Sequence, residues 1–596
     1  MILVFGGTTE GRKAAEVLEE SAQDKTYYYS TKTGEQDITL HHGQRIDGAL
    51  DKEGMQAFCR THGIRLIVDA AHPFASQLHQ TIAQVSEELE IPVIRYERIY
   101  PPRDPDITWI DDYSELSSLL PPLSSLLATT GVQSISKLKF LETKGVKVIY
   151  RILNRESSIA LALKQGASEA QLCFYEEPNA IPVEADGILL KESGLSGGFL
   201  EKVEAARAKG MKIIALKRPP LTTHPSPFTL HPSPFTIING PYGLRRAVEK
   251  LLPEFYPLHS GLTTGTCATA AAVAATLQLL KGETPDEVPV VLPNGETIMV
   301  AVGYGDDYAY CIKEAGDDPD VTNGLEIRAY PQPLPKGGES IMIEGGEGVG
   351  RFTLPGFDYP PGEAAINKGP REMIRQNLSL IAHHSSLKVT ISVPQGAEIA
   401  KRTFNPRLGI EGGISIIGVS GIVKPFSEEA FVDSIRKCMT VAKASGAERV
   451  VINSGGKSER FVKALYPELP QQVFVEYGNY IGETLKIAHE LDIRNVTLGV
   501  MLGKAVKLAA GHLDTHSRKT VMDKTFVQQL LRESGLSIDI SDMTLARELW
   551  ERIPGNQLDT FAHRVILHCA EHCNPILPNG KLTILLIDDN GKIYGV

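Results

Sequence analysis

Residues 1–18 read MILVFGGTTEGRKAAEVL, in which a loop of glycine and threonine joins an apolar run to a helical pattern. The run Ile2–Phe5 predicts a buried strand, and Gly11–Glu20 predicts the helix that follows it. Glycine lets a ligand approach the backbone closely, and the free N–H groups at the start of a helix favour phosphate. This strand-loop-helix unit indicates an α/β fold with an anion-binding loop, although a plain strand-to-helix turn has a similar sequence.

A second loop of this kind lies far along the chain, in the stretch LHSGLTTGTCATAAAVA at residues 258–274. It also leads into an alanine-rich helical pattern, and it also stands at the head of a block of domain size. The chain of 596 residues is too long for one hydrophobic core. We therefore interpret the sequence as two enzymes joined end to end.

The composition is that of a globular protein, with 42% hydrophobic and 22% charged residues. The net charge of −11 argues against a general nucleic-acid binder, because neutralising phosphates requires a surplus of lysine and arginine. The first residues lack the basic region of a signal peptide, and glycine interrupts the apolar run early. We therefore expect a cytoplasmic protein that does not insert into a membrane.

The seven cysteines are odd in number and scattered, which favours reduced thiols over a disulfide framework. One cluster, His568-Cys569-Ala570-Glu571-His572-Cys573, would place two histidines or two cysteines on one helix face. A complete set of metal ligands at a recognised spacing is missing there. We therefore expect a half-buried helix and no metal site.

Short apolar runs alternate with helical patterns through the first 250 residues. The helical stretches Ala75–Glu88 and Gly198–Lys209 separate several of these runs. The alternation predicts a doubly wound parallel sheet, arranged as two Rossmann-like halves with a hinge near 101–105. The predicted strands are Ile2–Phe5, Leu66–Asp69, Val93–Ile94, Leu126–Thr129, Val146–Tyr150, Gly187–Lys191 and Lys212–Leu216.

The two blocks meet after a proline-rich region. A tandem heptapeptide at 224–237, HPSPFTLHPSPFTI, predicts an extended surface loop or a small local duplication, because proline prevents regular helix. The stretch Gly240–Leu252 predicts a closing helix, and 253–259 predicts a linker. We therefore assign residues 1–252 to the first enzyme and 260–596 to the second.

The second block changes character near residue 447. Between 286 and 345 it contains turn-forming Pro-Asn-Gly sequence and short alternating runs, which predict an antiparallel or mixed sheet. From 448 the alternation of strand and helix returns, with strands predicted at Arg449–Ile452, Val473–Glu476 and Val496–Met501. We expect an α+β subdomain up to about 447, followed by a parallel α/β subdomain over 448–596.

A further motif of the first block, VDAAHPFA at 68–75, lies at the end of a predicted strand, where open parallel sheets bind ligands. Other short motifs are ATTG at 128–131, RIL at 151–153 and KESG at 191–194. Together with GGTTEGR at 6–12, they resemble the precorrin-6A reductase family over residues 1–250. The resemblance implies reduction of a macrocyclic imine bond by a nicotinamide cofactor held between two Rossmann-like halves.

The resemblance also implies which residues form the reductase site. Asp69 and His72, the candidate catalytic residues, would lie near the nicotinamide or the substrate carboxylates, although His72 could instead be a structural cap before Pro73. Hydride transfer depends on positioning, so we expect no nucleophile, and no residue is identified as a proton donor. The cofactor-binding residues would be Gly6, Gly7, Thr8, Thr9, Glu10, Arg12 and Lys32, and Lys32 leaves both NADH and NADPH open.

Six motifs follow one another in the second block. They are GLTTGTCA from 261, KEAGDDPDVT from 313, GGEGVGR from 345, AIN from 365 with PR from 370, TFNPRLGI from 403 with GGIS from 412, and LAAGH from 508 with THS from 515. Their order closely resembles the cobalt-precorrin-5B C-1 methyltransferase family over nearly all of 258–596. Leu513-Asp514 departs from the Asn-Thr-His element of the family pattern. The resemblance implies methyl transfer from S-adenosylmethionine to a ring carbon of a macrocycle.

The residues themselves indicate where the methyl donor would bind. The sequence VVINSGGKSE at 450–459 is a strand-loop-helix unit, and Glu476 ends the next predicted strand, where an acidic residue commonly binds ribose hydroxyls. The predicted donor-binding residues are Asn453, Ser454, Gly455, Gly456 and Glu476. The residues predicted to bind the macrocycle come from the six motifs: Thr263, Thr264, Thr266, Lys313, Asp317, Asp318, Asn405, Arg407, His512 and His516.

The sequence therefore predicts a bifunctional enzyme of the corrin ring. The second block would methylate cobalt-precorrin-5B, and the first would reduce the resulting cobalt-precorrin-6A. The expected ligands are small cobalt-corrinoid substrates, without nucleic acid or membrane, and a homo-oligomer stays open. Two alternatives remain: a tetrapyrrole- or nucleotide-binding protein without activity, and an unrelated α/β reductase fused to an anion-binding domain.

Overall fold

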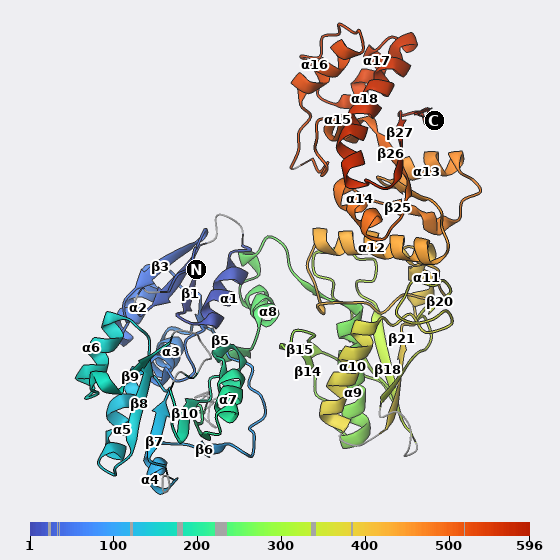
Figure 1. Ribbon diagram of the computed structural model, residues 1–596. Coiled ribbons are helices and arrows are strands. Elements are labelled where there is room, and N and C mark those ends of the chain that lie inside the picture. Colours follow the sequence, from blue (N-terminus) through green and yellow to red (C-terminus); the bar gives the residue numbers. More distant parts are fainter. Residues whose placement is uncertain are drawn as a thin grey trace. The chain divides into compact units, whose positions relative to one another are not determined.

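The computed structural model describes residues 1–595 apart from 22–25, 33, 35, 120–122, 176–180, 182, 221–234, 335–340, 383–385 and 518. The chain divides into two compact units (Figure 1). The first contains Met1–Ser260 with Val291–Ile298, and the second contains Gly261–Val290 with Met299–Val596. Most of the heptapeptide repeat, predicted to be an extended loop, lies outside the described residues, but its last three residues, 235–237, belong to a strand.

The first unit contains two six-stranded sheets, and all the strand pairs in both sheets are parallel. The first sheet has the order β12-β5-β4-β1-β2-β3, with β1 (Ile2–Phe5), β2 (Tyr27–Thr31), β3 (Gly43–Asp47), β4 (Leu66–Asp69), β5 (Val93–Tyr96) and β12 (Phe235–Ile238). The second has the order β6-β11-β10-β7-β8-β9, with β6 (Thr108–Ile110), β7 (Ser125–Ala128), β8 (Lys147–Ile152), β9 (Leu172–Phe174), β10 (Gly187–Lys191) and β11 (Lys212–Leu216). The predicted α/β class with parallel sheets is confirmed.

The chain passes between these two sheets twice. After β5 it continues into β6 of the second sheet, and it returns from β11 to the first sheet as β12, which pairs with β5. Helices join successive strands on both sheets (Figure 1). They are α1 (Thr9–Leu18), α2 (Lys52–Thr61), α3 (Ser76–Leu89), α4 (Leu116–Leu119), α5 (Ile135–Glu142), α6 (Glu156–Lys164) and α7 (Phe199–Ala208), and α8 (Pro241–Leu251) follows β12.

The segment 253–259, which the sequence predicts to be a linker, packs as part of the first unit. Phe255 and Tyr256 are buried in the core that also contains residues of β1 and α8. The guanidinium of Arg245 lies 3.4 Å from the centroid of the Tyr256 ring. This packing extends the first unit to Ser260.

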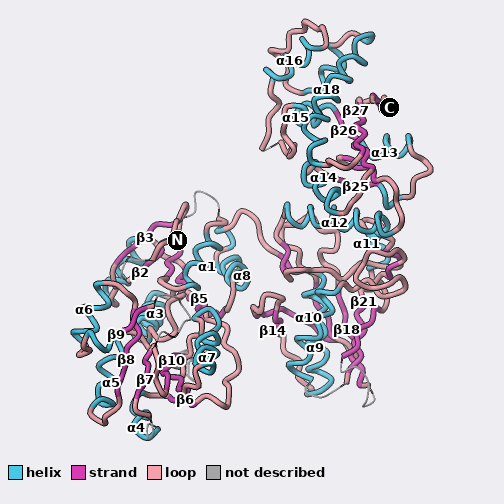
Figure 2. Tube along the Cα trace, in the orientation of Figure 1, coloured by secondary structure: helices cyan, strands magenta, loops and turns pink. Residues whose placement is uncertain are grey.

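The first part of the second unit is built on a mixed sheet of the order β16-β17-β18-β21-β19. Helix α9 is buried along most of its length, because its alanines and threonines are small enough to pack closely against α10 and the sheet (Figure 1). The elements of this part are α9 (Thr264–Lys281), α10 (Lys368–Ala382), α11 (Gly396–Ala400), β13 (Gly261–Leu262), β14 (Glu287–Val291), β15 (Thr297–Ala301), β16 (Gly303–Tyr304), β17 (Ala309–Ile312), β18 (Glu326–Pro333), β19 (Ile341–Gly345), β20 (Arg351–Phe352), β21 (Leu387–Ser392), β22 (Ile410–Glu411) and β23 (Ile422–Val423). Figure 2 shows long loops among the helices and strands of this part, and the motifs from 313, 345 and 365 lie largely outside helices and strands.

The second part of this unit is a sheet of the order β25-β24-β26-β27-β28, parallel except for its last pair. Its strands are β24 (Val450–Asn453), β25 (Phe474–Glu476), β26 (Asn495–Met501), β27 (Lys581–Ile587) and β28 (Ile593–Tyr594). Its helices are α12 (Glu428–Ala444), α13 (Gly456–Leu465), α14 (Ile481–Glu490), α15 (Leu502–Ala509), α16 (Lys524–Glu533), α17 (Leu549–Arg552) and α18 (Leu558–Cys573). In the part of the chain that the structure describes, every helix is too short or too polar to cross a membrane.

Candidate functional sites

The glycine-threonine loop at the N-terminus links two of the predicted motifs directly. Thr8 is the N-cap of α1, where its Oγ1 accepts a hydrogen bond of 3.0 Å from the N–H of Gly11. The same hydroxyl donates a hydrogen bond of 2.7 Å to the carbonyl of Ala70, in the VDAAHPFA motif. Gly7 has a φ of +85°, and no atom lies within 4 Å of the place where its Cβ would be. There is therefore open space beside the Cα of Gly7, while its N–H donates to Oε1 of Gln36 at 3.0 Å.

We expect Thr8→Ala to lower the free energy of unfolding of the first unit by about 1 kcal/mol, because it removes a helix cap. It should also weaken binding of the nicotinamide cofactor that the sequence resemblance implies, since the variant loses the bond from Thr8 to Ala70. Calorimetric unfolding and a nicotinamide titration of the full chain measure the two effects. Thr8→Ser keeps the hydroxyl and serves as the control, and equal losses in both variants would contradict this explanation.

Three other predicted cofactor residues have different environments. Glu10 is buried, and its carboxylate accepts a hydrogen bond of 2.9 Å from Nε of Arg98 and another from Ser196. This bond joins α1 to the segment after β5, and Ser196 belongs to the second half. Arg12 and Lys32 are both exposed. Glu10 is thus engaged within the protein, while the two cations remain accessible.

Asp69 ends β4 and is almost completely buried, with 2% of its surface exposed. Its carboxylate oxygens lie 2.9 Å from Nη1 of Arg95 and 2.7 Å from Nδ1 of His79. Burial alone would raise the pKa of Asp69, but the hydrogen bond from His79 and the charge of Arg95 outweigh it and hold the pKa below its ordinary value. Asp69 is therefore a buried carboxylate at neutral pH.

His72 lies three residues further along the chain, in a basic environment. Its Nδ1 accepts a hydrogen bond of 3.2 Å from the N–H of Phe74. Burial, followed by the charges of Arg98, Lys191 and Arg95, lowers the pKa of His72 to about 3. The imidazole is thus neutral at physiological pH. The local bond to Phe74 agrees with a capping role, and the surrounding cations make the place suitable for an anionic ligand.

The two halves of the first unit meet near His72. Phe74 packs against the core of the second sheet, and the ammonium of Lys191, the last residue of β10, lies 5.0 Å from the centroid of its ring. We call the region formed by His72, Phe74, Arg95, Arg98 and Lys191 the junction. A cavity of about 180 Å³ opens beside it, lined in part by Asp69, His79, Arg95, Glu97, Arg218 and Phe235.

The sequence reasoning did not identify His79, Arg95 or Arg98. Arg95 interrupts the apolar run of β5, and a charged residue in a buried strand is a usable signal of an internal ion pair. His79 follows His72 on the next helix, and nothing in its own neighbourhood indicates a partner. Its bonds to Asp69 and to the carbonyl of His72 depend on tertiary structure.

In the second unit, the predicted donor-binding residues come together at one edge of a sheet. β25 and β26 flank β24, so the carboxyl ends of these three strands are neighbours. Asn453 is fully buried, and its Oδ1 accepts a hydrogen bond of 3.0 Å from the N–H of Gly455. Gly455 has a φ of +140°, and a Cβ built there would lie 3.3 Å from Oε1 of Glu476. The loop after β24 therefore faces the acidic residue that ends β25.

Two cations complete this edge. Lys504, in α15, donates a hydrogen bond to the carbonyl of Gly478, and burial lowers its pKa to about 8. Arg407 lies in the TFNPRLGI motif and pairs at 2.6 Å with Glu459, the fourth residue of α13. A motif predicted to bind the macrocycle thus lies beside the loop predicted to bind the methyl donor.

The threonines of the GLTTGTCA motif bond mainly to backbone. Oγ1 of Thr266 donates to the carbonyl of Gly421 at 2.6 Å, and Oγ1 of Thr264 accepts from the N–H of Ile417 at 2.8 Å. Thr263 caps α9 by accepting from the N–H of Thr266 at 3.2 Å. The loop is therefore held tightly against the segment 415–421, next to the GGIS motif.

The other residues predicted to bind the substrate lie in different environments. Lys313 is buried and pairs with Asp320 at 3.0 Å. Asp318 accepts a hydrogen bond of 3.0 Å from the N–H of Phe426, whereas Asp317 is exposed. Asn405 is buried and donates to the carbonyl of Gly413 at 3.0 Å. His512 is exposed and His516 is half-buried.

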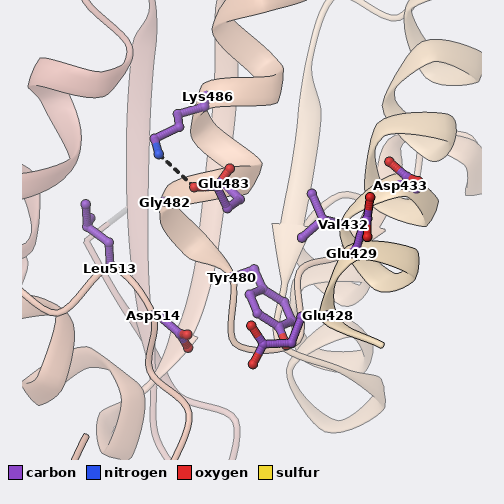
Figure 3. A pocket seen from close by; sticks show the side chains of 10 residues that line it. All are labelled: Glu428, Glu429, Val432, Asp433, Tyr480, Gly482, Glu483, Lys486, Leu513 and Asp514. Carbon is purple, nitrogen blue, oxygen red and sulfur yellow. Dashed lines mark hydrogen bonds and ion pairs between the residues drawn. The ribbon is translucent and has the colours of Figure 1, made fainter. Parts of the chain in front are cut away.

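The structure also contains a cavity of about 420 Å³ that the sequence did not indicate. It lies between α12 and α14, and Figure 3 shows its lining side chains. Tyr480 lies beside Glu428 in this view, and Lys486 pairs with Glu483 at 2.7 Å. The remaining lining residues are Glu429, Val432, Asp433, Gly482, Leu513 and Asp514.

The histidines and cysteines clustered in the C-terminal helix contact neighbouring groups of the same chain. Cys569 and Cys573 are buried, and the thiol of Cys569 lies 3.3 Å from the carbonyl of Ala505. His568 bonds to Glu533 at 2.8 Å. No group of three potential metal ligands occurs among the residues that the structure describes.

Comparisons with known proteins cover both blocks. Residues 1–231 match the family model "Precorrin-6x reductase CbiJ/CobK", residues 253–425 match "CbiD", and residues 514–596 match "CbiD, C-terminal domain". A cobalt-precorrin-5B C(1)-methyltransferase of Prosthecochloris aestuarii is 41% identical over 345 residues, which cover 55% of this chain and 94% of that one. The enzyme of the same name from Brucella anthropi is 43% identical over 351 residues, covering 56% and 95%.

Two solved structures are also similar to parts of the chain. The cobalamin biosynthesis protein CbiD from Archaeoglobus fulgidus is 31% identical, with a TM-score of 0.26, and the match covers 48% of this chain and 86% of that one. A structure named CobK precorrin-6A reductase is 16% identical, with a TM-score of 0.33, and the match covers 42% and 96%.

Proposed function

This chain belongs to the cobalt-precorrin-5B C(1)-methyltransferase family in its second block and carries a precorrin-6x reductase domain in its first, and from this premise we propose that it catalyses two consecutive steps of corrin-ring synthesis. The second block transfers a methyl group to C-1 of cobalt-precorrin-5B. The first block reduces the product, cobalt-precorrin-6A. The methyl donor is S-adenosylmethionine, and the reductant is NADH or NADPH.

The observation that carries the reductase assignment is the hydrogen bond between its two motifs. Thr8 of the GGTTEGR loop donates to Ala70, next to Asp69, so β1 and β4 bring both motifs to one sheet edge. The open space beside Gly7 leaves room for a cofactor phosphate at the start of α1. When bound, the nicotinamide supplies the hydride. Asp69 holds Arg95 and His79, and this arrangement positions the loop that contains His72.

We assign the two six-stranded sheets to the two Rossmann-like halves of this reductase. The cofactor loop belongs to the first half, while the second half contributes Lys191 to the junction. A corrinoid carries several carboxylates, and arginine and lysine are their usual partners in proteins. The junction is therefore where we place the macrocycle against the nicotinamide.

The methyl donor is assigned to the carboxyl edge of the second unit's parallel sheet. No atom lies within 4 Å of a Cβ built at Gly456, so the loop after β24 is open where Asn453 holds its shape. Glu476 suits the ribose hydroxyls and Lys504 suits a carboxylate. The methyltransferase needs mainly alignment of the ring carbon with the sulfonium methyl in a dry pocket.

Incubation of the full chain with cobalt-precorrin-5B and S-adenosylmethionine tests the proposal, with mass measurement as the readout. We expect the product to gain one methyl group without nicotinamide, and two further hydrogens only when NADH or NADPH is added. A comparison of the two nicotinamides also decides the cofactor. A protein that binds both ligands tightly without turnover would instead support a non-catalytic tetrapyrrole- or nucleotide-binding protein.

A further inference from the structure

Reduction of a double bond by a nicotinamide requires a proton donor, because hydride transfer leaves an electron pair on the second atom of the bond. The candidates are the titratable side chains at the junction and next to it. Three of them are carboxyls, Asp69, Glu10 and Glu97. Both oxygens of each accept bonds from neighbouring side chains, and Asp69 stays ionised because its pKa is below the ordinary value. Asp69 therefore has no proton to give, and the oxygens of Glu10 and Glu97 are engaged within the protein.

The histidines and arginines of this region are also unsuitable. His72 is neutral at physiological pH, because its pKa is lowered to about 3. The two ring nitrogens of His79 lie 2.7 Å from Asp69 and 3.0 Å from the carbonyl of His72, so both are occupied within the protein. Arg95 and Arg98 carry guanidinium groups, which are too basic to release a proton.

Lys191 is the remaining group at the junction. It ends β10 at the carboxyl edge of the second sheet, where parallel sheets bind ligands, and it is half-buried. Its ammonium lies 5.0 Å from the ring centroid of Phe74, and among the described residues it has neither a hydrogen-bond acceptor nor a carboxylate within ion-pair distance. All three N–H groups are therefore available to a ligand that contacts the VDAAHPFA motif.

The surroundings of Lys191 also favour release of its proton. The charged group that acts on it from a neighbouring element is Lys137 of α5, and the titratable group facing it from the first half is the neutral His72. Burial, assisted by Lys137, lowers the pKa of Lys191 to about 8. An acid of this strength is protonated at neutral pH and can still transfer a proton efficiently.

We propose that Lys191 is the catalytic residue that donates the proton during reduction, an inference that rests on the proposed reductase activity. The hydride from the nicotinamide forms a bond to one atom of the substrate double bond. The electron pair of that bond moves to the other atom, which takes a proton from Nζ of Lys191. The macrocycle gains two electrons and two hydrogens, the nicotinamide is oxidised, and the lysine, now an amine, regains its proton from water.

Substitution of Lys191 in the full chain tests this role. We expect Lys191→Met to lower kcat of the reduction by about 10²–10⁴-fold, the range typical of a lost general acid. Methyl transfer, in the other block, should be unchanged in the same sample. Lys191→Arg should be as slow as Lys191→Met, because a guanidinium keeps the charge but does not release a proton.

The pH dependence separates a proton donor from a carboxylate-binding lysine. In the wild type, kcat of the reduction should fall as the pH rises above about 8, because the amine has no proton to donate. Neither variant should show this fall. If Lys191 only bound a substrate carboxylate, Lys191→Arg would keep kcat near the wild-type value and both variants would mainly raise KM, and this result would overturn the inference.

A second readout does not depend on turnover. Acylation of lysines by an amine-selective reagent, followed by mass spectrometry at several pH values, should show the reactivity of Lys191 rising with a midpoint near pH 8. Lys202 is the matched control for the kinetics, because it is half-buried nearby but its ammonium already donates to the carbonyl of Gly197 at 2.9 Å. Lys202→Met should retain most of the reduction rate. If the wild type reduces the substrate and Lys191→Met does so at the same rate, Lys191 is not the proton donor, and the proposed function is left intact.

Discussion

Replacing Asp69 by alanine will destabilise the first unit by about 3–5 kcal/mol, the usual cost of leaving a buried charge without its partner. Arg95 is 4% exposed, and its Nη1 donates to the carboxylate and the carbonyl of Asp69 and to the carbonyl of Ala71. Without the carboxylate, Glu97 is the remaining acid paired with the guanidinium among the described residues, at 3.5 Å. His79 loses its acceptor as well, so the loop that contains His72 loses its support.

Calorimetric unfolding of the full chain, with both activities assayed, measures this effect. The transition of the first unit should move to lower temperature and the reduction should be lost, while methyl transfer persists. Asp47→Ala is the matched control, because Asp47 pairs with Arg45 on the same sheet in an exposed position, and its unfolding should be close to that of the wild type. An unchanged transition in Asp69→Ala would show that Arg95 does not depend on this carboxylate.

The pH dependence has a defined sign. The pKa of Asp69 is lower in the folded protein than in the unfolded chain, so its contribution to stability is present above the unfolded pKa. That contribution is lost as the pH falls through the folded pKa. The difference in stability between the wild type and Asp69→Ala should therefore be constant near neutral pH and shrink only in strong acid.

Gly455→Ala should lower methyl transfer by about 10²-fold or more, because displacement of a positioning loop by about 1 Å has an effect of this size. Gly455 has a φ of +140° and a ψ of −176°, a backbone conformation that costs a side chain about 1–3 kcal/mol of strain. The added Cβ would also approach Oε1 of Glu476 to 3.3 Å. Relief of the backbone strain, or of the close approach between Cβ and Oε1, moves the loop away from the acidic residue at the end of β25.

Titration with S-adenosylmethionine and a methyl-transfer assay measure this result, and reduction in the first block provides an internal control. Gly503→Ala is the matched variant, since Gly503 lies in α15 near the same edge and no atom lies within 4 Å of its Cβ position. Alanine suits a helix better than glycine, so this variant should be active and slightly more stable. Full methyl transfer by Gly455→Ala would exclude the loop after β24 as the donor site.

Most of the strands that were predicted from the sequence lie inside a sheet, and most of those that were not predicted lie at an edge. The central strands β1, β4, β7, β10 and β11 are covered on both faces and have continuous apolar runs, which the sequence shows directly. The strands β2, β3, β6, β9 and β12 were not predicted, and all of them except β2 are sheet edges. β3 reads GQRID and is largely accessible, so its composition does not differ from that of a loop.

The candidate sites show the same division between local and distant information. The motifs were recognised because each is a continuous stretch, and the structure joins two of them through Thr8 and Ala70. Partners such as Arg98 for Glu10, or Gly421 for Thr266, lie far away in the sequence. A hydroxyl that could bind a ligand cannot be distinguished by sequence from one that binds a distant carbonyl. For this reason the threonine-rich loops look similar, although the second is mainly packed against backbone.

The return of β12 to the first sheet has a consequence during synthesis of the chain. Until residue 238 has left the ribosome, β5 is an open sheet edge whose backbone N–H and C=O groups can pair with another nascent chain. The second sheet is complete earlier, because its last strand in sequence ends at Leu216. The first sheet, whose strands begin the chain, is therefore completed after the second sheet. A chain stalled between these two points should be the species most prone to aggregation and most dependent on chaperones in the cell.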